Sequence, residues 1–235
     1  MTLWYVTTGI SLWNSSTCWR LEGSQDGKSW AARRDELKKR LASTADCRQE
    51  ELQRAADQLV AGNFRSECWD PKDAGHVRAL SAELSTLLLL WGQPGGVQSG
   101  DEIRIIQGYS TPEVAAVLKA ILERVMRDAP AVRCAVTLTP KCYRLDPKES
   151  ASFNRAIHDL WNGEIQERDP AGTARFVMTG GYKAVLMALA VRMGRRGRGR
   201  IYYSHEGEPR VIPRVIMLSM TDEGLLEVDA TGTSF

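Results

Sequence analysis

The residues best suited to chemistry lie late in the chain, between a short apolar segment and an apolar helix. The segment at 175–179 is followed by two glycines, Tyr182 and Lys183, and then by "AVLMALAVRM". Glycine lets a backbone approach a ligand closely, and the unpaired N–H groups at a helix start attract anions. With the charge of Lys183, this pattern predicts a phosphate-bearing ligand. Taken alone, paired glycines are more often only a tight connection, and a single lysine is more often solvated.

Two other loops share this polar, small-residue character. They are "TTGISLWNS" at 7–15 and "GYSTPE" at 108–113, and each leads from a predicted strand toward a helix. Ligands bind at the carboxyl ends of the strands in open α/β sheets. The loop at 179–183 matches neither the Walker A nor the G-x-G-x-x-G spacing. Helix capping and turn formation explain each loop alone, so the prediction depends on all three sharing one edge of the sheet.

Two further patterns have simpler explanations than a site. The run "GRRGRGR" at 194–200 could bind phosphates, but cations also suit the solvated C-terminal end of a helix. His205 and Glu206 could act as an acid–base pair, yet a surface pair before a turn is the simpler interpretation.

The sequence argues against a metal site, a duplex nucleic-acid partner and a membrane partner. The five cysteines form no C-x-x-C pair and the three histidines are widely spaced, so no metal and no cofactor are expected. Reduced thiols are typical of a cytoplasmic protein. A net charge of +2 favours a small anionic ligand over duplex nucleic acid. The N-terminus lacks signal-peptide features and no apolar run approaches the roughly 20 residues that span a bilayer, so no membrane partner is expected.

The apolar patterns predict strands that alternate with helices. Strands are expected at 3–10, 102–110, 131–139, 175–179, 200–205 and 210–218. Helices are expected within 30–61 and at 74–91, 111–128, 149–166 and 182–193. Alternation with nearly all-apolar strands predicts an α/β fold with a Rossmann-like, mostly parallel sheet flanked by helices.

The same patterns predict the organisation around that sheet. Pro213 cannot donate to a ladder, so the last predicted strand is expected at a sheet edge. A helical elaboration at about 30–91 separates the first two strands. No internal repeat or linker is evident, so residues 1–235 are expected to form a single domain.

Five motifs, in this order along the chain, resemble those of one known family. They are "TTGISLWN" after the first strand, "SAEL" in the helical block, "GYSTPE" after the second strand, "FVMTGGYK" before a late helix and "IYYSHEGEPRVIP" near the end. The chain resembles CARF-domain proteins of type III CRISPR systems over almost its whole length. Tyr182 stands where the family usually has phenylalanine, and Trp13 stands where an aliphatic residue is commoner.

The resemblance implies a ligand and a mode of binding. CARF domains are Rossmann-like and form homodimers, and their ligand is a cyclic oligoadenylate, such as the tetra- or hexa-adenylate, that lies across the two-fold axis. A two-fold site suits a ring with two-fold symmetry. Some members only sense the ring, whereas ring nucleases cut it without a metal. In that reaction a ribose 2′-OH attacks the adjacent phosphorus in line and leaves a 2′,3′-cyclic phosphate.

The resemblance also assigns residues to the site. Lys183 would stabilise the charge of the phosphorane and Ser11 would orient a phosphate or the 2′-OH, so these are the expected catalytic residues. Tyr109 or Trp13 would stack on an adenine. The expected ligand-binding residues are Thr8, Gly9, Ile10, Ser11, Leu12, Trp13, Asn14, Gly108, Tyr109, Ser110, Thr111, Thr179, Gly180, Gly181, Tyr182 and Lys183.

The leading interpretation is a CARF protein that binds cyclic oligoadenylate and degrades it as a metal-independent ring nuclease. Degradation is favoured because no second domain with effector features follows the CARF-like part. The first alternative is a non-catalytic CARF sensor that controls an effector domain or a separate partner chain. The second is a Rossmann-type nucleotide-binding enzyme, which the missing G-x-G-x-x-G spacing and the lack of an acidic residue placed for a ribose disfavour.

Overall fold

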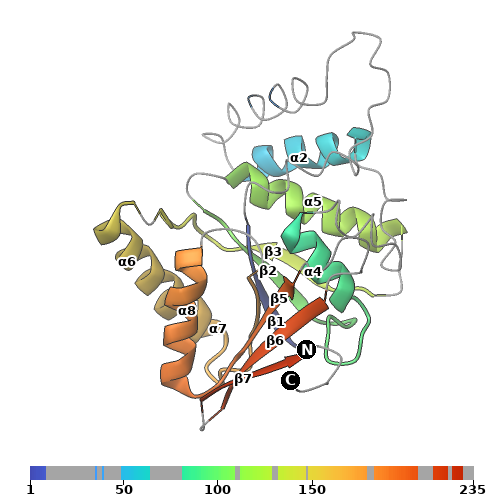
Figure 1. Ribbon diagram of the computed structural model, residues 1–235. Coiled ribbons are helices and arrows are strands. Elements are labelled where there is room, and N and C mark those ends of the chain that lie inside the picture. The colour runs from blue at the N-terminus through green and yellow to red at the C-terminus, as the bar shows by residue number, and fades with distance from the viewer. Residues whose placement is uncertain are drawn as a thin grey trace.

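The chain folds into a central sheet with helices on both faces (Figure 1). The described residues of the computed structural model are 1–8, 35, 39, 49–63, 81–108, 112–128, 132–146, 148–178, 183–205, 214–221 and 224–229. Only the backbone is described at Lys183, His205, Thr221 and 224–229. This arrangement confirms the predicted Rossmann-like α/β fold.

In the described part of the chain the sheet has seven strands, in the order β3-β2-β1-β4-β5-β6-β7. They are β1 (Leu3–Thr7), β2 (Glu102–Ile106), β3 (Ala135–Leu138), β4 (Arg175–Val177), β5 (Arg200–His205), β6 (Arg214–Thr221) and β7 (Gly224–Asp229). Strands β1 to β5 pair in parallel, whereas β6 pairs antiparallel with both β5 and β7. The sheet is therefore mostly parallel, with an antiparallel extension at one side.

Two layers of helices enclose the sheet (Figure 1). The described helices are α2 (Gln49–Asn63), α4 (Ala82–Leu90), α5 (Pro112–Asp128), α6 (Ser150–Leu160), α7 (Gln166–Arg168) and α8 (Lys183–Arg196), with a π-helical turn, η4 (Trp161–Ile165), between α6 and α7. One apolar core joins α2, α4 and α5 to the face that carries Trp4 and Val6. A second core joins α6, η4 and α8 to the face that carries Tyr5 and Phe176.

Helix α5 shows how the sequence produces these layers. Pro112 occupies its first position, where the missing N–H costs no hydrogen bond. Its apolar side chains recur every three or four residues and so lie on one side of the helix. The six large apolar residues of this side are all buried: Val114, Val117, Leu118, Ile121, Leu122 and Val125.

A buried ionic cluster lies between the sheet and η4. Arg104 of β2, with 8% of its surface exposed, pairs with Glu102 at 3.0 Å and with Glu164 of η4, which is 3% exposed. The Tyr5 hydroxyl lies 3.3 Å from a carboxylate oxygen of Glu164. Thr137 of β3 donates to Glu102 at 2.9 Å. Buried charges need such partners, so the π-helical turn here has a structural explanation: it presents Glu164 to Arg104.

The antiparallel side of the sheet corrects one prediction. The strand expected at 210–218 begins at Arg214, and β7 pairs along its whole length, so this strand is not at the sheet edge. Pro213 itself lies outside the described residues. Strand β7 was not expected, although Leu225, Leu226 and Val228 suit a strand.

The helical block between the first two strands is confirmed in its described parts. Helices α2 and α4 both fall within 30–91 and lie between β1 and β2 along the chain. Helix α2 packs against α5, and α4 packs against β4, β5 and β6. The block therefore thickens one helical layer and leaves the strand order unchanged.

Candidate functional site

The candidate site is the edge of the sheet at which the parallel strands end. We call it the carboxyl edge and define it by the strand ends at 7–8, 106–108 and 177–178 together with the start of α8. Strand β1 pairs with β2 on one side and with β4 on the other. Helix α5, which follows β2, and α8, which follows β4, cover opposite faces. The carboxyl ends of β1 and β4 therefore meet at a topological switch point, where open α/β sheets bind ligands.

Threonine side chains connect the strand ends at this switch point. The Thr7 hydroxyl lies 3.5 Å from the Val177 carbonyl oxygen, and the Thr8 hydroxyl donates to the Ile106 carbonyl at 3.4 Å. Thr7 is buried and Thr8 is half-buried. The segment that leaves β1 is therefore tied to both neighbouring strands at its first residues.

The end of β2 is held by residues that follow β3. The Gln107 amide side chain donates to the carbonyl of Thr139, and the Gln107 backbone N–H donates to the Thr139 hydroxyl at 3.1 Å. The Tyr143 backbone N–H donates to the Gln107 carbonyl at 2.8 Å, and Gly108 forms a parallel bridge with Tyr143. These contacts fix the direction in which the chain leaves β2 toward "GYSTPE" at 108–113.

Tyr143 places an unpaired polar group beneath this edge. The residue is 2% exposed, and its hydroxyl has no hydrogen-bond partner in the described part of the chain. Burial, with a smaller contribution from the charge of Glu164, raises the pKa of Tyr143 to about 12. Lys141 lies 5.4 Å from the centre of its ring. The tyrosine therefore stays neutral at ordinary pH and can donate one further hydrogen bond.

The first turn of α8 differs in charge from those of α2, α4, α5 and α7, whereas α6 likewise lacks an acidic residue there. Helices α2, α4 and α5 each have an acidic residue in the first turn, which stabilises the positive end of the helix dipole. Helix α8 begins with Lys183 and has no acidic residue there. An anion at this position would offset both the lysine charge and the unpaired N–H groups.

The "SAEL" segment places a buried carboxyl group in α4, which lies on the face of the sheet opposite to α8. Ser81 caps α4 by accepting a hydrogen bond from the Leu84 N–H at 3.3 Å, and Glu83 is only 1% exposed. The other end of α4 leads into the loop at 92–101, which Arg175 contacts at the start of β4. The N-terminal end of α4, with Glu83, therefore faces the carboxyl edge.

The fold brings together the strand ends from which the three predicted loops continue. Thr8 and Gly108 lie at the ends of β1 and β2, and the backbone of Lys183 begins α8 after β4. The Lys183 side chain is not described. The other predicted site residues lie outside the described part of the chain: Gly9, Ile10, Ser11, Leu12, Trp13, Asn14, Tyr109, Ser110, Thr111, Thr179, Gly180, Gly181 and Tyr182.

Sequence reasoning missed the residues that brace this edge. Gln107, Thr139 and Tyr143 belong to no motif, and their contacts join segments more than 30 positions apart.

Within the described ranges no group of three or more His, Cys, Asp and Glu side chains could hold a metal ion. None of the described helices is long and apolar enough to cross a membrane.

Comparison with known proteins adds no assignment for this edge. Neither the protein-family models nor the curated proteins searched include a match to the chain. The function of the carboxyl edge therefore has to be argued from its geometry and from the motifs that follow the strands.

Proposed function

We propose that the chain is a CARF-type protein that binds a cyclic oligoadenylate at the carboxyl edge and cleaves it as a metal-independent ring nuclease. One observation is its main support. Val6 of β1 pairs in register with Val177 of β4, so the segments that continue as "TTGISLWN" and "TGGYK" leave neighbouring strands at the switch point.

The charge distribution supports an anionic ligand at this edge. Lys183 begins α8 without an acidic residue in the first turn, and the helix N–H groups there have no intrahelical partners. The phosphates of an oligoadenylate ring would supply negative charge at this position. The adenines would stack on Tyr109 or Trp13, the aromatic residues of the first two loops.

The proposed reaction needs positioning and charge stabilisation from the protein. A ribose 2′-OH attacks the adjacent phosphorus, the O2′–P bond forms and the P–O5′ bond breaks. The 2′-OH loses its proton and the departing 5′ oxygen gains one, so a 2′,3′-cyclic phosphate and a 5′-OH remain. Ser11 orients the 2′-OH or a phosphate, and Lys183 stabilises the charge that develops on the phosphorane.

The proposal includes a homodimer with the ring on its two-fold axis. A ring of four or six identical units has two-fold symmetry, so two copies of one edge can hold it equivalently. Each copy would present its own Lys183 and Ser11 to a phosphate of the ring.

Two alternatives make different predictions for the same edge. A CARF sensor would bind the ring through the same loops and leave it intact, passing the signal to an effector domain or partner chain. A Rossmann-type nucleotide enzyme would bind a linear nucleotide at the switch point and show no preference for a ring.

Product analysis separates these possibilities. Purified protein is incubated with labelled cyclic tetra-adenylate and hexa-adenylate in the presence of EDTA, and the products are resolved by chromatography. We expect linear products that end in a 2′,3′-cyclic phosphate. Tight binding without cleavage would favour the sensor, and binding of linear nucleotides alone would favour the nucleotide enzyme.

A further inference from the structure

A second basic feature lies at the opposite end of the sheet, where the parallel strands begin. A pocket of about 440 Å³ opens there, between the starts of β1, β4 and β5 and the later part of β6. Three arginines line it: Arg175, Arg198 and Arg200. None of the described lining residues is acidic. The proposed function makes no use of this pocket.

Strand register puts three of its polar residues in one row. Arg175 of β4 pairs with Arg200 of β5, and Arg200 pairs with Ser219 of β6. Residues directly opposite on neighbouring strands project to the same face of a sheet. In this row two arginine side chains therefore start from neighbouring positions on one face of the sheet, with a serine at the next position.

One arginine of the row is held in place by the protein. Arg175 is half-buried, donates to the Gly95 carbonyl and lies 5.0 Å from the centre of the Trp4 ring. These contacts use some of the hydrogen-bond donors of the guanidinium group. Within the described residues no carboxylate neutralises its positive charge. Like charges directly opposite each other in a sheet are destabilising.

The other two arginines have no partner in the described part of the chain. Arg198 and Arg200 are exposed, and within the described residues neither has an ion pair or a side-chain hydrogen bond. Two described carboxylates that bond to lining residues of the pocket are already occupied: Asp101 accepts from the N–H groups of Thr2, Gln98 and Trp4, and Asp169 accepts from the backbone N–H groups of Thr173 and Ala174. The positive charge of the pocket is therefore available to a ligand.

We propose that this pocket is a second anion site that binds a small ligand with a diphosphate or sugar-phosphate group. Guanidinium groups bind phosphate oxygens in pairs, and several arginines that line one pocket suit the oxygens of neighbouring phosphates. Arg198 and Arg200 are the main ligands, and Arg175 is a fixed third positive charge. The volume is in the range of small-molecule sites and exceeds what a single phosphate needs.

Arginine protection and equilibrium binding together test this site. Phenylglyoxal modifies accessible arginines, and mass spectrometry then locates the modified positions. Pyrophosphate should protect Arg198 and Arg200 in the unaltered protein, while the exposed Arg127 and Arg195 stay reactive. Calorimetry with pyrophosphate and with ribose 5-phosphate then shows whether the pocket binds a free diphosphate or a sugar phosphate more tightly.

Matched variants complete the test. R198Q/R200Q should weaken binding of the better probe about tenfold or more, whereas R127Q/R195Q removes the same charge elsewhere and should change it less than about twofold. D222N/E223Q neutralises the two acidic residues that connect β6 to β7 and should leave binding equal or tighter. Equal losses in both arginine variants, no protection of Arg198 and Arg200, or affinities weaker than about 1 mM for both probes would overturn the proposal.

Discussion

Val6 and Val177 are direct partners in the parallel pairing of β1 with β4. This pairing joins residues that are far apart in the sequence, and it sets the first and third motif loops at neighbouring strand ends. It also places them where the covering helices α5 and α8 lie on opposite faces. The account of the site depends on this pairing more than on any single loop.

The Glu164 carboxylate should contribute strongly to stability because it neutralises the buried Arg104. Glu164→Gln leaves the guanidinium with one carboxylate fewer in a buried site and should lower the free energy of unfolding by about 3 kcal/mol. Glu167→Gln changes an exposed residue three positions away and should cost less than about 0.5 kcal/mol. Urea unfolding of both variants checks this, and equal costs would contradict the structural role given to η4.

Asp101 should make stability depend on pH in the acid range. Burial alone would raise the pKa of Asp101, but hydrogen bonds from Thr2, Gln98 and Trp4 together outweigh it and hold the pKa below its usual value. The stabilisation is therefore fully present above the unfolded pKa of about 3.9 and is lost as the pH falls through the lower folded value.

A variant without the Asp101 carboxylate tests this pH dependence of stability. Asp101→Asn should be less stable than the parent by about 2 kcal/mol at pH 7, because the N–H donors around it lose a charged acceptor. The two stability curves, measured by urea unfolding from pH 7 to pH 3, should approach each other as the pH falls. Curves that stay parallel would show that Asp101 does not titrate as the structure indicates.

Cys134 should be a slow nucleophile. Burial raises the pKa of its thiol to about 11, and the negative charge of Asp101 adds to the effect. At pH 8 only a small fraction is thiolate, so iodoacetamide should modify Cys134 about tenfold more slowly in the folded protein than in urea. Mass spectrometry of alkylated peptides over time provides the measurement, and equal rates would mean that the thiol is not shielded.

The oligomeric state tests the part of the proposal that depends on symmetry. Light scattering should give a mass of about twice 26.1 kDa, with cyclic tetra-adenylate favouring the dimer further. A monomer both with and without the ring would leave no two-fold axis for the ligand.

The chemical mechanism predicts how an altered substrate behaves. A ring with 2′-deoxy riboses lacks the nucleophile, so it should bind with similar affinity and resist cleavage. Cleavage of the unmodified ring should continue in EDTA. Cleavage that requires an added metal would contradict attack by the 2′-OH without a metal and would direct attention to His205 and Glu206.

Local patterns predicted much of this fold because they report burial directly. The apolar repeat at 111–128 is an example: it predicted the helix, and the repeating side chains of α5 are buried. The edge position of the last predicted strand was wrong because β7 pairs with the outer side of β6, and a rule about a single proline cannot show which strands pair.

Contacts between distant segments were not predictable in this way. Arg104 and Glu164 meet across 60 positions, Gln107 meets Thr139 across 32, and nothing in either local sequence indicates the partner. The row of Arg175 and Arg200 likewise follows from strand register alone. The starts of the three motif loops, by contrast, were expected at one edge because parallel strands end on the same side of a sheet.

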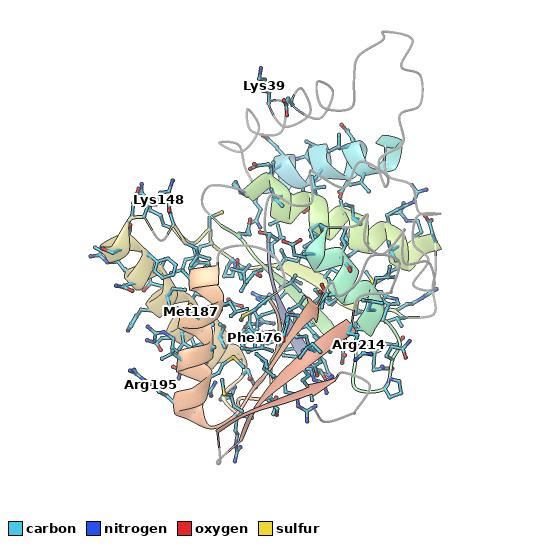
Figure 2. All side chains as sticks on the ribbon, viewed as in Figure 1. Lys39, Lys148, Phe176, Met187, Arg195 and Arg214 are labelled. Carbon is cyan, nitrogen blue, oxygen red and sulfur yellow. The ribbon has the colours of Figure 1, made fainter. Side chains whose placement is uncertain are left out.

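The most direct test of the central claim is calorimetric binding of cyclic tetra-adenylate and hexa-adenylate, with 2′-deoxy rings used to prevent turnover. Lys183→Ala is compared with Arg195→Ala, which removes one positive charge from the exposed far end of the same helix (Figure 2). We predict that Lys183→Ala costs about 2–5 kcal/mol of binding free energy and that Arg195→Ala costs well under about 1 kcal/mol. Equal losses in the two variants, or no binding of either ring by the unaltered protein, would contradict the account.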